Sequence, residues 1–153
     1  MKAISLWQPW ASALFTPLKP DETRHWPMPT KLIGEPIAIH ASLTDTRETR
    51  MYWEDFNTGF NVEEIAQAFE RLKIRHYGDF PRGCIIGWCV FGAPLHTSTI
   101  AEWKDHRSAL QRRFGDYSPK RFAWPKQRAE LFAKPYPCTG RQGFFDWTKP
   151  EEL

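Results

Sequence analysis

The stretch Lys19-Pro20-Asp21-Glu22-Thr23-Arg24-His25-Trp26 is the part of the chain on which the fold assignment depends. Successive side chains of an extended chain point to opposite faces, so Glu22, Arg24 and Trp26 share one face. Lys19 lies three residues before Glu22 and approaches from the preceding turn. A carboxylate, a guanidinium, an ammonium and an indole together favour a strand that lines a pocket. The plainer interpretation is an exposed ion pair at a strand start, which adds little stability.

The segment before this stretch predicts a strand, an elbow and a short helix. Residues 2–7 alternate in polarity, as a strand does. Pro9 suits the first turn of a helix, where its missing N–H is no loss. Residues 10–16 are expected to be helical, because Pro17 and Pro20 follow and end the helix. The predicted order is strand, Trp-Gln-Pro-Trp elbow, short helix, Lys-x-x-Glu-x-Arg and strand.

This order, with Ile39-His40-Ala41-Ser42 soon after it, resembles the ASCH family, a branch of the PUA-like β-barrel superfamily. Phe122-Ala123-Trp124 and residues 140–147, Gly-Arg-Gln-Gly-Phe-Phe-Asp-Trp, resemble the closing strands of that family. The resemblance covers most of the chain, with a gap from about Leu43 to Pro81. It implies an α+β fold, a PUA-like mixed β-barrel of about 5–6 strands with about 3–4 peripheral helices.

Residues 1–153 are expected to form a single domain, with a helical insertion at about 44–80. Within the insertion, Asn61 and Glu64 predict a capping box for a helix over 62–75, and residues 47–56 predict a second helix. Residues 83–91 are apolar on both faces and predict the central strand. A further helix is expected from Thr99 toward Phe114. The last strands are expected at 122–124, about 128–134 and 142–147.

Composition excludes several classes of protein. No apolar run is long enough to span a bilayer and no signal-peptide pattern is present, so a cytoplasmic protein is expected. Cys84 and Cys89 fall on opposite faces of a strand, and no histidine has zinc-type spacing with them. We therefore expect neither a metal nor a cofactor. Phosphate-binding glycine loops and Gly-x-Ser-x-Gly elbows are also lacking.

The charge is unevenly distributed, although the net charge is only +3. Residues 1–60 hold 6 Lys and Arg against 7 Asp and Glu, whereas residues 107–141 hold 9 against 2. A local basic field of this kind suits a phosphate backbone, and some of the eight tryptophans are available for stacking on bases. The alternative is a solvated basic face. The basic residues predicted to form a positive surface beside the pocket mouth are Arg112, Arg113, Lys120, Arg121 and Arg128.

The resemblance implies a pocket between the barrel and the helices, lined by the Lys-x-x-Glu-x-Arg stretch. Some members of the family are associated with RNA, and others are small enzymes. One group resembles amidohydrolases of N-acylated cytidine, whose Lys falls on Lys19, whose Thr falls on Glu22 and whose Arg falls on Arg24. Glu22 cannot attack a carbonyl as a Thr hydroxyl does, so in an enzyme it would activate water, with Lys19 or Arg24 stabilising the oxyanion. Asp116 is the candidate for the more distant carboxylate, by position only.

Two functions are therefore carried forward. The first is a module that binds RNA or a modified nucleoside in the pocket. The second is a hydrolase, acting either on an acylated nucleoside or as a metal-independent ribonuclease. The candidate catalytic residues are Lys19, Glu22 and Arg24. The candidate binding residues are Trp7, Gln8, Trp10, Trp26, Arg113, Tyr117, Lys120, Arg121 and Phe122.

Overall fold

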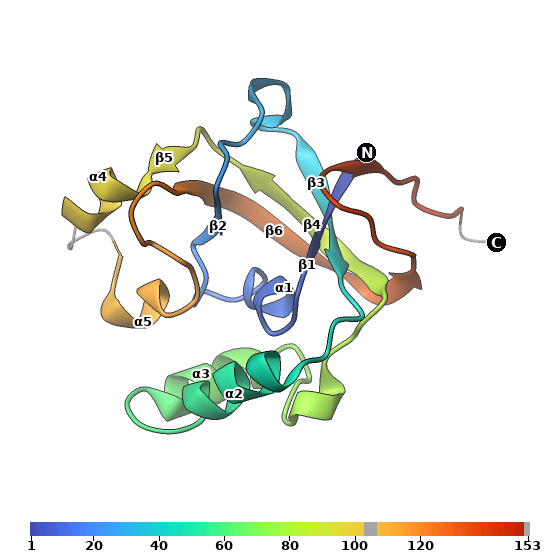
Figure 1. Cartoon of the computed structure of the whole chain (residues 1–153). Coiled ribbons are helices and arrows are strands. Elements are labelled where there is room, and N and C mark those ends of the chain that lie inside the picture. Colours follow the sequence, from blue (N-terminus) through green and yellow to red (C-terminus); the bar gives the residue numbers. More distant parts are fainter. Residues whose placement is uncertain (103–106, 152–153) are drawn as a thin grey trace.

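A computed structural model describes residues 1–102 and 107–151, without the side chains of residues 100–102. Its centre is a curled mixed sheet that forms a half-barrel (Figure 1). The strands are β1 (Lys2–Leu6), β2 (Asp21–Arg24), β3 (Pro36–Ala41), β4 (Cys84–Phe91), β5 (Leu95–His96), β6 (Phe122–Pro137) and β7 (Phe145–Asp146). The helices are α1 (Trp10–Ala13), α2 (Arg47–Phe56), α3 (Val62–Glu70), α4 (Thr97–Glu102) and α5 (Ala109–Arg112), with 3₁₀ turns at η1 (Thr30–Leu32) and η2 (Tyr77–Asp79).

The strands run in the order β2-β6-β4-β3-β1-β7, and β5 also pairs with β6. Only the β1–β3 pair is parallel among the strand pairs that the structure describes. The α+β class and the mixed, barrel-like sheet expected from the sequence are confirmed. No helix in residues 1–102 and 107–151 is long and apolar enough to cross a membrane.

The long strand β6 replaces two separate strands expected at 122–124 and 128–134. Its first residues pair with β2, and from Lys126 onward it pairs with β4. The register shifts between Val90 and Phe91, next to the point where β6 changes partner. Pro125 lies at the point where β6 changes partner from β2 to β4. Proline has no backbone N–H to donate, and at this point neither strand pair needs one. The strand therefore bends and continues through the proline.

The core divides into three clusters. Ile4 and Leu6 of β1 face the interior of the half-barrel, where they pack with residues such as Trp124. Ala3, on the opposite face of β1, packs under Phe145 in a smaller cluster. This alternation follows the two-residue period of a strand. The third cluster joins α2 and α3 to α1 and to the segment after α5 through aromatic residues that include Phe56, Phe69 and Phe114.

The helical insertion lies beneath the half-barrel, with α2 and α3 side by side (Figure 1). The predicted helix 47–56 is confirmed, whereas the helix predicted over 62–75 ends at Glu70. The expected Asn61 cap is wrong, because Asn61 adopts a left-handed conformation and its side chain makes no cap bond. The helix expected over 99–114 is instead two short ones, α4 and α5, and the intervening residues 103–106 lie outside the described part. The described helices thus number five, more than expected.

Candidate functional site

Strand β2 supplies the floor of a cavity of about 720 Å³. It pairs with the start of β6, so that Glu22 faces Trp124 and Arg24 faces Phe122 along the ladder. Lys19, Glu22 and Arg24 all line this cavity, which we call the first cavity. The strand periodicity that placed Glu22 and Arg24 on one face therefore agrees with the structure.

Glu22 lies between two cations. Its Oε1 is 3.4 Å from the Lys19 ammonium, and its Oε2 is 3.1 Å from Nη2 of Arg24. Oε1 also accepts from the backbone N–H of Thr23, and Oε2 also accepts from Nε of Arg24. Two hydrogen bonds and two ion-pair contacts thus engage the carboxylate of Glu22, which offers about four acceptor positions.

Lys19 lies at the bottom of the first cavity and its side chain is only 2% exposed. Its ammonium donates to the backbone carbonyl of Phe114 at 2.6 Å. Burial lowers the pKa of Lys19, because an ammonium loses its hydration there, while the Glu22 carboxylate opposes this change. The Arg24 guanidinium is more accessible, with 26% of its side chain exposed, and also donates to the carbonyl of Ser5. Arg24 is thus the floor residue that a ligand can reach most directly.

Aromatic rings form the walls of the first cavity. Trp7, Trp10 and Trp26 all line it, as the sequence predicted for the pocket. Trp26 packs edge-on against Trp124 at 4.9 Å, and the Arg24 guanidinium lies 6.0 Å from the centroids of both rings. Trp7 is 47% exposed, a large fraction for an indole in a folded protein. It offers a ring face to a ligand.

The rim of the cavity is basic but partly neutralised. Arg113 forms an ion pair with Asp55 at 3.3 Å, and Arg121 forms one with Asp116 at 3.4 Å. Asp116, proposed as the distant carboxylate, lines the cavity and accepts from the backbone of Ser118. Tyr117 also lines it.

Three predicted binding residues lie outside the first cavity. Gln8 is fully buried, where its amide donates to the hydroxyl of Ser12 and to the carbonyl of Pro81, so it holds the elbow together. Phe122 packs against the core and against His96 instead of forming a cavity wall. Lys120 is exposed in the loop before β6 and does not line the cavity. Arg112 and Arg128, predicted on a positive surface beside the pocket mouth, are not among the residues that line the cavity.

Sequence reasoning missed two features of this site. Tyr52, from α2 of the insertion, lines the first cavity and packs edge-on against Trp10 at 4.9 Å. Asp21, fully buried beside Glu22, accepts two bonds from Arg107 at 2.6 and 2.9 Å and one from Tyr117 at 2.7 Å. Burial and the Asp21 carboxylate together raise the pKa of Tyr117. The Arg107 guanidinium compensates the charge of the fully buried Asp21 carboxylate, which would otherwise be costly to bury.

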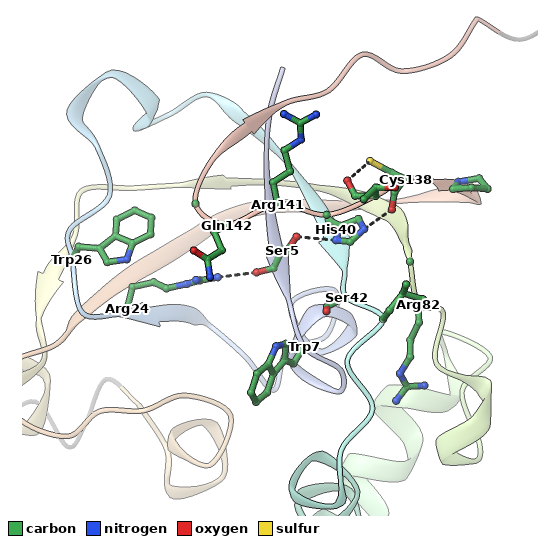
Figure 2. A pocket seen from close by; sticks show the side chains of 16 residues that line it. Ser5, Trp7, Arg24, Trp26, His40, Ser42, Arg82, Cys138, Arg141 and Gln142 are labelled. Carbon is green, nitrogen blue, oxygen red and sulfur yellow. Dashed lines mark hydrogen bonds between the residues drawn. The ribbon is translucent and has the colours of Figure 1, made fainter.

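A second cavity, of about 1130 Å³, shares lining residues with the first. Figure 2 shows the side chains that line this second cavity. At its centre the hydroxyl of Ser5 lies 2.8 Å from Nδ1 of His40, and Nε2 of His40 lies 2.7 Å from the carbonyl oxygen of Cys138. Because a carbonyl only accepts, Nε2 carries the proton and Nδ1 accepts from Ser5. Burial lowers the pKa of His40, which favours this neutral form.

Residues 1–102 and 107–151 contain no cluster of three or more His, Cys, Asp or Glu side chains that could hold a metal ion. The three cysteines, Cys84, Cys89 and Cys138, are all free thiols. Burial raises the pKa of Cys89 to about 12, so this thiol stays protonated at neutral pH.

The curled mixed sheet with helices around it is a fold that this chain shares with ASCH proteins of known structure. The solved structures that share it include the ASCH protein of Zymomonas mobilis, with a TM-score of 0.52 and 17% sequence identity over 97% of this chain and 87% of that one. A tyrosine-to-phenylalanine variant of that protein matches with a TM-score of 0.52, 17% identity and 97% and 90% coverage. A serine-to-alanine variant matches with a TM-score of 0.51, 18% identity and 97% and 88% coverage. No protein-family model and no curated protein match the chain.

Proposed function

We propose that this protein is a member of the ASCH family that binds RNA by holding one base, or a modified nucleoside, in the first cavity. The observation that carries the proposal is that three indoles and two phenols surround one cavity whose floor is formed by Lys19, Glu22 and Arg24. The volume of about 720 Å³ lies in the range of small-molecule pockets. A cytoplasmic location remains a prediction.

The chemistry of the walls suits a nucleobase. Aromatic side chains stack on any base, and each such contact is worth about 1–3 kcal/mol. Arg24 presents a planar set of N–H donors that fits a carbonyl or phosphate oxygen. Glu22 is already engaged by two hydrogen bonds and by ion pairs to Lys19 and Arg24, so its role in this proposal is to position Arg24 and Lys19 for the ligand.

The test is a titration of purified protein with a panel of nucleosides and a short single-stranded RNA, followed by tryptophan fluorescence. Trp7→Ala should weaken the tightest binder by about tenfold, because it removes one stacking face. Phe60→Ala is the matched control, since Phe60 is 90% exposed and lies outside the first cavity. Binding to no member of the panel, or equal affinity in all three proteins, would overturn the proposal.

Hydrolysis of an N-acylated cytidine, or of RNA, is the second candidate function. The observation that favours it is the buried Lys19 ammonium, whose pKa is lowered and which therefore releases its proton more easily than a surface lysine does. A neutral amine at this position could accept a proton from an attacking water or hydroxyl. Lys19→Ala should then abolish release of the acid from an acylated cytidine while leaving the protein folded by circular dichroism. If the wild-type protein hydrolyses neither an acylated cytidine nor RNA, the hydrolase hypothesis is wrong and the binding function is the one that stands.

A further inference from the structure

The two cavities share one wall. Ser5, Trp7, Arg24 and Trp26 line both of them, so the lining continues from one to the other without a break. Figure 2 shows Arg24 reaching from the side of Trp26 toward Ser5 at the centre of the second cavity. A ligand longer than one nucleoside could therefore lie across Arg24 with a part in each cavity.

The second cavity differs from the first in its charge. Arg24, Arg82 and Arg141 line it, and no Asp or Glu is among its lining residues, whereas Glu22 and Asp116 line the first. Because Arg24 is paired with Glu22, the positive charge of the second cavity comes from Arg82 and Arg141. In the described part of the chain neither Arg82 nor Arg141 forms an ion pair. Nε and Nη2 of Arg82 are buried and have no hydrogen-bond partner among the described residues. The Arg82 guanidinium lies over the ring of Tyr77 at 4.7 Å and points away from the Ser5–His40 pair (Figure 2). The field in this cavity therefore favours an anion.

The loop 139–143 adds backbone donors to this field. Gly140 lies against the Ser5–His40 pair, and a Cβ there would be 2.6 Å from Cε1 of His40 and 2.7 Å from Oγ of Ser5. Gly143 has a φ of 67°, a conformation that favours glycine. Within the described residues, the N–H groups of residues 140–143 donate to no backbone or side-chain acceptor. Free backbone N–H groups beside arginines are common contacts to phosphate oxygens.

We propose that the second cavity binds the phosphate of the nucleotide that follows or precedes the base held in the first cavity. The ligand is then a single-stranded oligonucleotide of at least two nucleotides, and Arg24 lies between the base and the phosphate. This inference rests on the proposed function of the first cavity. Arg141, which projects from the loop at the cavity edge, is the residue most free to contact the phosphate (Figure 2).

The experiment compares four ligands of the same base: the nucleoside, its 5′- and 3′-monophosphates, and a dinucleotide. We expect the dinucleotide to bind about tenfold tighter than the nucleoside. Arg141→Gln should remove most of that gain without changing the affinity for the nucleoside. Arg128→Gln is the charge-matched control. Arg128 lies on β6, packs over the Trp88 ring of β4 and lines neither cavity. Since Arg141 is exposed on a loop, its variant is expected to fold.

The outcomes separate this inference from the proposed function. Equal affinities for nucleoside and dinucleotide, with dependence on Trp7 retained, would overturn the phosphate site and leave the base site standing. A monophosphate that reproduces the whole gain would overturn the oligonucleotide ligand in favour of a free nucleotide. A dinucleotide gain that survives Arg141→Gln and Arg82→Gln together would place the phosphate elsewhere. Failure of every ligand to bind would overturn the proposed function itself.

Discussion

At the scale of single residues, Glu22 is the charge that balances the floor of the first cavity. Glu22→Gln would remove the carboxylate while the almost fully buried Lys19 ammonium remains. Because an unpaired buried charge is costly, we expect the free energy of unfolding to fall by roughly 3–5 kcal/mol. Urea denaturation followed by circular dichroism measures it.

The double variant Lys19→Met/Glu22→Gln is the control for this prediction. Removal of both charges leaves no unpaired ammonium, so the double variant should be less destabilised than the sum of the single variants. A Glu22→Gln protein as stable as the wild type would show that the Phe114 carbonyl is enough to hold Lys19 in place without the carboxylate.

His40 gives a second prediction at this scale. Burial lowers its pKa in the folded protein, although the bond to the Cys138 carbonyl opposes this. The unfolded chain therefore takes up a proton near pH 6.5 that the folded protein does not, and stability should fall as the pH drops through that value. His40→Gln should lose less stability than the wild type between about pH 7.5 and about pH 5.5.

The matched control for His40 is His96→Gln, because His96 is exposed and lies on β5, away from the second cavity. Chemical denaturation at several pH values provides the measurement. Parallel pH profiles of the wild type and His40→Gln would contradict the assignment of a neutral, buried imidazole.

At the scale of elements, Lys126 ties β6 to the segment that leads into β2. Its ammonium donates to the carbonyls of Leu14, Thr16 and Lys19 at 2.7 to 2.9 Å. Burial lowers the pKa of Lys126 to about 8, so most of the side chain still carries its charge at neutral pH. Lys126→Met would leave the three carbonyls without this donor, and we expect a loss of roughly 2–4 kcal/mol in the free energy of unfolding.

Lys134→Met, on an exposed part of the same strand, is the control for Lys126 and should leave stability within about 0.5 kcal/mol of the wild type. Similar midpoints for the two variants would mean that the three carbonyls find other donors. The Lys126→Met variant should also affect the first cavity, because Lys126 donates to the backbone carbonyl of Lys19, a residue of the cavity floor.

The elements also mark the limit of what the sequence could predict. Local periodicity was enough for β1, β2, β3, β4 and α2, because each depends on neighbouring residues. The bend of β6 at Pro125 was not predictable, since it depends on a change of partner strand. Tyr52 was missed for a similar reason: it reaches the first cavity only because the insertion packs against α1, more than forty residues earlier in the chain. Asp21 and Arg107, separated by 86 residues, meet through the same long-range packing.

At the scale of the whole molecule, the excess of basic residues in 107–141 does not form one uniform face. Arg113 and Arg121 line the first cavity, Arg141 lines the second, and Arg112 and Lys120 line neither. The basic residues of 107–141 therefore fall into two groups: those that line a cavity and can contact a ligand there, and those that line neither cavity.

This division predicts how binding of a single-stranded RNA depends on salt. Each phosphate contact that is lost lowers the slope of log K against log salt by about 0.7 for a single strand. The double variant Arg113→Gln/Arg121→Gln should therefore show weaker binding and a slope shallower by up to about 1.4. Arg112→Gln/Lys120→Gln removes the same charge from nearby positions outside the cavity, so its slope should match that of the wild type. Fluorescence anisotropy over a range of salt concentrations measures both slopes.

Equal slopes in the two double variants would mean that the basic field acts on RNA only through its total charge. The rim of the first cavity would then have no special part in binding.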